Sequence, residues 1–140
     1  YATLYGDMAG GFAVIKDVFQ TFVYRLCHSR NAQGDHGPVI PENIIIRPPS
    51  AELKPGQTDQ DSLPPYEVLD AIIAAYMERD ESPQTIIASG LPAGDVTRVV
   101  AMLKRNEYKR RQSPVGVRVT QRGFGKDWRY PITSRYVDAV

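Results

Sequence analysis

The stretch from Pro48 to Tyr66 holds the chain's densest set of side chains that can do chemistry. Prolines flank a polar run that offers hydroxyl, amide and carboxylate groups: Ser50, Glu52, Gln57, Thr58, Asp59, Asp61 and Ser62. A loop of this length without periodicity is uncommon in a compact domain and usually forms an active-site lid, a binding loop or a disordered segment. Disorder is disfavoured, because the stretch leads directly into a strongly amphipathic helix.

A second candidate is the glycine-rich turn Tyr5-Gly6-Asp7-Met8-Ala9-Gly10-Gly11. Glycine lets a backbone come close to a ligand, and an exposed Asp7 there can bind a ribose hydroxyl, an amide or a base edge. Glycine and aspartate are also the usual residues of an ordinary turn. The spacing does not match a dinucleotide-binding fingerprint, so the motif by itself leaves both interpretations open.

Basic side chains cluster in residues 104–111, which read Lys-Arg-Asn-Glu-Tyr-Lys-Arg-Arg. Such a cluster at the end of a helix can clamp phosphate. It can also interact with the helix dipole and with water alone, which is the commoner outcome for such a composition. The net charge of +1 argues against a nucleic-acid interface.

Neither metal binding nor thiol chemistry is indicated. His28 and His36 lack metal-ligand spacing with each other or with Cys27, the single cysteine. Cys27 has no histidine–aspartate context, so packing is a commoner role for it than nucleophilic attack. We therefore predict no metal site among these residues.

Length and composition limit the classes of protein to which the chain can belong. The chain has 140 residues, 42% of them hydrophobic and 24% charged, which suits one domain with a real core. No apolar run is long enough to cross a membrane. A single cysteine fits a reducing compartment, so we expect a cytoplasmic location. The chain opens on Tyr1 rather than methionine, and we expect it to be an internal or C-terminal piece of a longer protein.

Helical periodicity dominates the chain. We predict a helix capped by Asp17, a helical turn with Pro41 in its first position, and a helix from Pro65 with an apolar stripe to Met77. Two more helices are predicted, one from Ser82-Pro83 to Gly90 and one capped by Asp95 that presents Val96, Val99, Val100 and Leu103. Short strands are predicted only at residues 12–15 and 115–119. The fold class is therefore mostly α for this chain.

Four motifs in fixed order resemble the C-terminal part of the synthetase domain of glutamine-dependent NAD synthetases, over nearly the whole chain. They are Thr3-Leu4-Tyr5-Gly6-Asp7-Met8-Ala9-Gly10, Pro48-Pro49-Ser50-Ala51-Glu52-Leu53 through Tyr66, Asn106-Glu107-Tyr108-Lys109-Arg110, and Phe124-Gly125-Lys126-Asp127 with Arg129-Tyr130-Pro131-Ile132. The resemblance implies a parent domain with an α/β, Rossmann-like adenine nucleotide alpha-hydrolase (N-type ATP pyrophosphatase) fold. It also implies a homo-oligomer.

The resemblance implies a ligase. Members of the family use ATP and Mg²⁺ to adenylate the nicotinate carboxylate of deamido-NAD, and ammonia derived from glutamine then displaces AMP. By resemblance, Asp7 and Lys109 bind deamido-NAD, and Ser50 contacts an ATP phosphate. Asp59 lies on the catalytic loop that closes over the reacting groups. The charge of Lys109 suits a site where phosphate and a developing oxyanion meet.

The sequence departs from the family pattern in two ways. Gln20 stands where family members carry a lysine that serves ATP, although Lys16, one helical turn earlier, is a candidate substitute. The Ser-Gly-Gly-x-Asp-Ser pyrophosphate loop and the glutaminase domain are absent from residues 1–140. We therefore expect the chain alone to be inactive. The alternative is a catalytically inactive helical assembly module that keeps the family's subunit-contact surface.

Overall fold

The computed structural model describes residues 11–33, 37–49, 55–124, 127–133 and 136. These residues form six α-helices, one 3₁₀ turn and one π-helical turn, and within them there is no β-strand. In order they are α1 (Gln20–Ala32), α2 (Glu42–Ile46), η1 (Asp59–Asp61), α3 (Tyr66–Ile73), η2 (Ala74–Glu78), α4 (Pro83–Ala88), α5 (Ala93–Arg105) and α6 (Glu107–Gln112). The prediction of a mostly helical chain is confirmed for this part.

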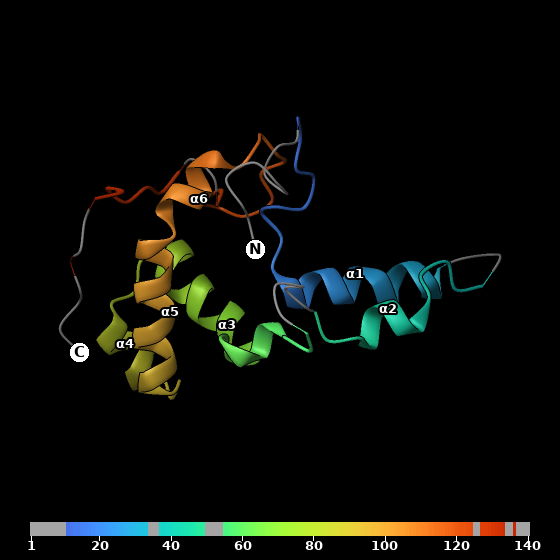
Figure 1. Cartoon of the computed structure of the whole chain (residues 1–140), viewed down its shortest axis with the longest axis horizontal. Coiled ribbons are helices and arrows are strands. Elements are labelled where there is room, and N and C mark those ends of the chain that lie inside the picture. Colours follow the sequence, from blue (N-terminus) through green and yellow to red (C-terminus); the bar gives the residue numbers. More distant parts are fainter. Residues whose placement is uncertain (1–10, 34–36, 50–54, 125–126, 134–135, 137–140) are drawn as a thin grey trace.

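The hydrophobic core lies where α3, η2, α4 and α5 meet, on one side of the molecule (Figure 1). The apolar stripes predicted for α3 and α5 supply most of it. Its buried members are Ile72, Ala75, Tyr76, Met77, Ile86, Val96, Val99 and Val100. The sequence predicts this packing well because each stripe repeats at helical spacing over at least two turns.

The π-helical turn η2 continues α3 and changes which side chains are buried. The amide of Arg79 donates to the carbonyl of Ala74, five residues earlier, at 3.1 Å. A wider turn rotates successive residues differently from an α-helix, and three consecutive residues, Ala75, Tyr76 and Met77, are all buried here. The predicted stripe reached Met77, but its helical spacing did not include Ala75.

The predicted cap of α4 is confirmed, but two other predicted caps are wrong. Ser82 caps α4, since its hydroxyl accepts from the amide of Thr85 at 3.1 Å, and Gly90 follows the helix with φ of +102°. The predicted caps at Asp17 and Asp95 are wrong, because α1 and α5 begin after Phe19 and Pro92 instead.

Pro41 precedes α2 as its N-cap instead of occupying its first position. This difference is one residue, and it keeps the predicted helical turn in place. The α2 helix carries Ile44, Ile45 and Ile46, of which Ile45 alone is buried.

The strands predicted at residues 12–15 and 115–119 are wrong. The two segments do lie together, since the amide of Ala13 donates to the carbonyl of Val115 at 2.8 Å. A Cβ at Gly116 would lie 2.2 Å from the Ala13 carbonyl oxygen, so glycine permits this close approach. The alternating valines at 115, 117 and 119 are exposed rather than buried on one face.

Helices α1 and α2 extend away from the core, at the opposite end of the view (Figure 1). The side chain of Asn31 joins their connecting segment, accepting from the amides of Val39 and Ile40 and donating to the carbonyl of Ile40. Helix α1 contributes no buried residue to the described part, and its Leu26 is 47% exposed. Contacts of α1 with α3 attach it to the rest of the fold.

Candidate functional site

A cavity of about 430 Å³ opens between α3, α5 and α6. Its floor is apolar, and positive side chains stand among its lining residues. They are Lys16, Leu63, Leu69, Ile73, Val99, Met102, Leu103, Asn106, Lys109, Arg110, Ser113 and Phe124. A volume of this size with an apolar wall and a few polar groups is typical of a small-molecule site. We call it the larger cavity.

A smaller cavity of about 190 Å³ adjoins it. The two share Lys16, Ile73 and Phe124, so these side chains form a common wall. The smaller cavity carries more charge than the larger one. Its charged and amide groups are Lys16, Asp17, Gln20, Asp70, Glu78 and Arg122. Burial, followed by the neighbouring charge of Asp17, raises the pKa of the Glu78 carboxyl above its ordinary value.

Lys109 lies on α6 and lines the larger cavity, and its role in binding substrate stays a prediction. Its neighbour Arg110 is 5% exposed and pairs at 2.8 Å with Glu107, which is 1% exposed. Burial lowers the pKa of Arg110, and Glu107 opposes that effect. The sequence suggested that the basic cluster is mainly solvated. This interpretation is wrong for Arg110, which is a buried structural cation.

Arg110 also ties the C-terminal segment to α6. Its guanidinium donates to the carbonyl of Phe124 through Nε at 3.1 Å and Nη2 at 2.6 Å, and to the carbonyl of Trp128 at 2.6 Å. A guanidinium has five N–H donors in a rigid fork. One side chain therefore satisfies Glu107 and two backbone carbonyls at once.

Asp59 lies in the loop that the sequence predicts to be catalytic. Tyr66 at the start of α3 donates its hydroxyl to Asp59 Oδ2 at 2.7 Å, and the amide of Asp59 donates to the Pro49 carbonyl at 3.0 Å. Burial and the Asp59 carboxylate raise the pKa of Tyr66, so the phenol stays protonated and can donate. Asp59 is therefore held in one orientation, but it is not among the residues that line either cavity.

Gln20 is the first residue of α1 and lines the smaller cavity. Lys16 does not lie one turn earlier on the same helix, because α1 begins at Gln20. Its ammonium instead donates to the carbonyl of Pro114. Lys16 nevertheless lines both cavities, so it shares the smaller one with Gln20. The remaining two predicted site residues, Asp7 and Ser50, lie outside the described residues.

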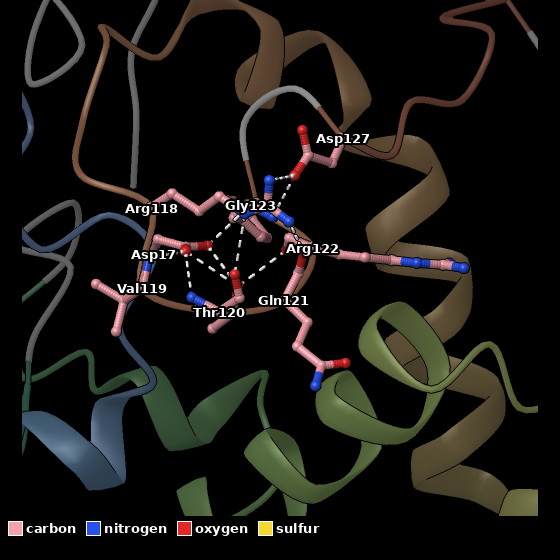
Figure 2. A network of polar contacts seen from close by, with 9 residues as sticks. Asp17, Arg118, Val119, Thr120, Gln121, Arg122, Gly123 and Asp127 are labelled. Carbon is pink, nitrogen blue, oxygen red and sulfur yellow. Dashed lines mark hydrogen bonds and ion pairs between the residues drawn. The ribbon is translucent and has the colours of Figure 1, made fainter.

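Asp17 is a residue whose role the sequence misassigned. Its carboxylate is 6% exposed and accepts from the amides of Val119, Thr120 and Phe124 at 2.7, 2.9 and 2.7 Å. The Thr120 hydroxyl is a further donor, at 3.0 Å from Oδ2. Figure 2 shows the bonds from Val119 and Thr120 converging on Asp17. No short-range signal marks these partners, which lie more than 100 residues away in sequence.

The ionisation of Asp17 follows from these contacts. Burial alone disfavours the charged carboxylate, but hydrogen bonds from Thr120, Phe124 and Val119 favour it more strongly. The pKa of Asp17 is therefore held below its ordinary value of 3.8. A charged carboxylate is the state that can accept from all four donors at once.

The described part of the chain contains no group of three or more histidine, cysteine, aspartate or glutamate side chains that could hold a metal ion. Cys27 is a half-buried free thiol on α1, and His28 next to it is exposed. No helix within the described residues is long and apolar enough to span a membrane.

The larger cavity combines an apolar wall with three cationic lining side chains, Lys16, Lys109 and Arg110, and comparison with known proteins shows the family to which the chain belongs. The family model described as NAD synthase matches residues 1–113. The chain therefore belongs to the NAD synthase family.

Individual relatives agree with this assignment. The chain is 56% identical to the glutamine-dependent NAD(+) synthetase of Thermotoga maritima over 100% of its own length and 24% of that protein. It is 54% identical to the enzyme of Aquifex aeolicus over 97% of its length, again 24% of the relative. A solved structure of the Acinetobacter baumannii enzyme in complex with ADP matches with a TM-score of 0.50 at 48% identity, covering 94% of this chain and 22% of that one. The chain thus spans about a quarter of the length of these relatives.

Proposed function

We propose that this chain is the C-terminal portion of the synthetase domain of a glutamine-dependent NAD(+) synthetase. The observation that carries the proposal is that Lys109 lines the larger cavity, next in sequence to Arg110 of the buried Arg110–Glu107 pair. An apolar cavity that is also lined by cationic side chains suits a ligand that has both a ring and anionic groups. Deamido-NAD is such a ligand, since it joins nicotinate and adenine through two phosphates.

The proposed reaction is the ATP-dependent conversion of deamido-NAD to NAD. The nicotinate carboxylate attacks the α-phosphate of ATP and releases pyrophosphate, and ammonia then attacks the acyl-adenylate carbonyl and displaces AMP. Negative charge grows on the carbonyl oxygen during this attack, and a fixed cation such as Lys109 stabilises it. The ADP bound to the Acinetobacter baumannii relative supports an adenine nucleotide as the second substrate.

Asp59 and Gln20 have different proposed roles. Asp59, oriented by Tyr66, lies on the loop that closes over the reacting groups and excludes water from the acyl-adenylate. Gln20 faces the smaller cavity, where its amide can donate to a phosphate but cannot neutralise it. The described residues contain no group of three or more histidine, cysteine, aspartate or glutamate side chains that could hold a metal ion, and we assign no ligand to the Mg²⁺ that is proposed to accompany ATP. The α/β fold of the complete domain is part of the same proposal.

A chimera tests this function directly. The 140 residues replace the matching segment of the Thermotoga maritima enzyme, and NAD formation from deamido-NAD, ATP and glutamine is measured. We expect the chimera to be active and the 140-residue chain alone to be inactive. Lys109→Gln in the chimera is expected to raise the KM for deamido-NAD by roughly 10- to 100-fold. Arg105→Gln is the matched control, because Arg105 is exposed on the same basic segment.

Two results would contradict the proposal. One is an inactive chimera that is folded and binds no deamido-NAD. The other is an equal loss in the Lys109 and Arg105 variants, because a general charge effect would then explain both. Turnover by the purified 140-residue chain, free of host enzyme, would refute the expected inactivity of the isolated chain.

A second candidate function, a helical assembly module, is favoured by the apolar surface of α1 and α2. Ile44 and Ile46 are 64% and 69% exposed, and Leu26 and Phe22 of α1 are also exposed. Apolar patches of this kind commonly mark protein contacts. Sedimentation of the 140-residue chain at micromolar concentration tests it. We expect a dimer or larger species in low and high salt, and a monomer of 15.6 kDa in both would exclude the module.

A further inference from the structure

The backbone of Phe124 is held from two sides. Its amide donates to Asp17 Oδ1 at 2.7 Å, and its carbonyl accepts from Arg110 Nε and Nη2 at 3.1 and 2.6 Å. The Phe124 ring lies against the same guanidinium, with 4.7 Å between the Arg110 Cζ atom and the ring centroid. A continuous path of short contacts therefore joins Asp17 to α6.

This path ends at the residue that binds substrate in the proposed function. Arg110 follows Lys109 on α6, and both line the larger cavity together with Phe124. Phe124 also lines the smaller cavity with Gln20. The position of Phe124 thus shapes both cavities, and Asp17 determines where the amide end of Phe124 lies.

We propose that Asp17 is a positioning residue for the deamido-NAD surface: its carboxylate fixes the 119–124 turn, which seats Phe124 against Arg110 and so sets the place of Lys109. The inference rests on the proposed function for the identity of the substrate. The physical coupling between Asp17 and α6 does not depend on the proposed function.

The geometry requires a carboxylate at position 17. Oδ2 accepts from the amides of Val119 and Thr120, while Oδ1 accepts from the amide of Phe124. Asparagine has one acceptor oxygen, and its NH₂ group is a donor. If that oxygen serves Val119 and Thr120, the NH₂ group faces the N–H of Phe124 and the bond is lost. The reverse orientation keeps Phe124 and releases the start of the turn.

The kinetic test uses Asp17→Asn in the chimera with the Thermotoga maritima enzyme. We expect the KM for deamido-NAD to rise roughly 10- to 100-fold, because a small misplacement of a binding group is sufficient for such a loss. The KM for glutamine should stay unchanged, and kcat should fall by less than the KM rises. Asp127→Asn is the matched control. Asp127 accepts from the amide of Gly123 at 2.9 Å, within the same turn, but it is exposed and makes no contact with α6 among the described bonds.

The structural test uses the 140-residue chain and is independent of activity. Backbone amide resonances are compared by NMR between the unsubstituted chain and the Asp17→Asn variant. We expect shifts in residues 119–124 and also in 107–112 of α6, with Asp127→Asn affecting only the turn. If Asp17→Asn does not fold, Thr120→Val replaces it, since this change keeps the backbone amide at position 120 and removes the hydroxyl that contacts Asp17 and the Arg122 carbonyl.

The outcomes separate the two proposals. Shifts confined to residues 119–124 overturn the positioning role, whatever the chimera does. An unchanged KM for deamido-NAD in an active Asp17→Asn chimera also overturns it, as does an equal loss for all substrates. An inactive chimera with Asp17 intact contradicts the proposed function instead, and the shifts in α6 then decide the coupling alone.

Discussion

Replacement of Arg110 by methionine is the most informative test of how the C-terminal half of the chain is held together. The substitution removes the 2.8 Å ion pair with Glu107 and the bonds to the carbonyls of Phe124 and Trp128. Glu107 is 1% exposed, so its carboxylate loses its main partner in a place where water cannot replace it. Arg111 remains, but its Nε lies 3.5 Å from Glu107 and its side chain is 37% exposed.

The expected cost follows from this geometry. Removing one partner of a buried ion pair typically destabilises a protein by about 3–5 kcal/mol. The residual contact with Arg111 places the expected value near the lower limit, at about 3 kcal/mol. Small domains are stable by about 5–15 kcal/mol in total, so Arg110→Met should remove a large part of the stability of the chain.

Urea unfolding of the 140-residue chain, followed by far-UV circular dichroism, measures this cost. Arg98→Met is the control, because Arg98 makes an ion pair of the same i,i+3 spacing with Asp95 at 3.0 Å, but with 47% and 27% exposure. An exposed pair of this kind contributes below about 0.5 kcal/mol. Similar midpoints for the two variants would refute the reasoning, because burial would then make no difference.

Three further changes have defined outcomes. Asp17→Asn should make the free energy of unfolding depend less on pH in the acid range. The pKa of Asp17 is lower in the folded state than its ordinary value of 3.8, so the charged carboxylate stabilises the fold above about pH 3.8. This stabilisation is lost as the pH falls through the folded-state pKa. Urea unfolding of the unsubstituted chain and the variant at a series of acid pH values measures this, and the same pH dependence of the unfolding free energy in both would contradict the prediction. Tyr66→Phe should cost about 1–2 kcal/mol in urea unfolding, because Asp59 loses its hydroxyl donor; no loss would show that the bond is replaced by water. Ser82→Ala should cost about 1 kcal/mol by the same measurement, since the Thr85 amide loses its cap, and Ser82→Thr should not.

The helical core was predictable from the sequence because the apolar residues that form it recur at helical spacing within short segments. The stripe of α5 places Val96, Val99 and Val100 on one face, and these three are buried as predicted. The same locality explains the failures. Val115, Val117 and Val119 alternate like a strand, but alternation says nothing about whether a partner strand exists, and among the described residues none does.

The candidate site was predictable only where a motif carried it. Lys109 and Gln20, which the resemblance singles out, line cavities, and Asp59 lies on a fixed loop turn, while their roles in binding and catalysis stay predictions. The shared wall of Lys16 and Phe124 had no sequence signal, because it joins residues 108 positions apart. Asp17 was misassigned for a related reason: a short polar side chain before an apolar periodic run is the usual N-cap signature, and distant amides compete for the same oxygens.

The buried Arg110–Glu107 pair is better explained by geometry than by stability. Apolar residues of similar volume often replace a buried ion pair at no cost in stability, so stability alone would not favour two desolvated charges here. Methionine and leucine, however, cannot donate to the carbonyls of Phe124 and Trp128, which Arg110 reaches simultaneously. We expect Glu107→Leu combined with Arg110→Met to recover much of the stability lost in Arg110→Met. Phe124 and Trp128 should nevertheless remain displaced, because their carbonyls have lost the guanidinium donor, although Arg111 still donates to the carbonyl of Tyr130 at 2.8 Å. A double variant that is stable but binds deamido-NAD weakly in the chimera would separate the two effects, whereas normal binding would show that α6 is positioned without Arg110.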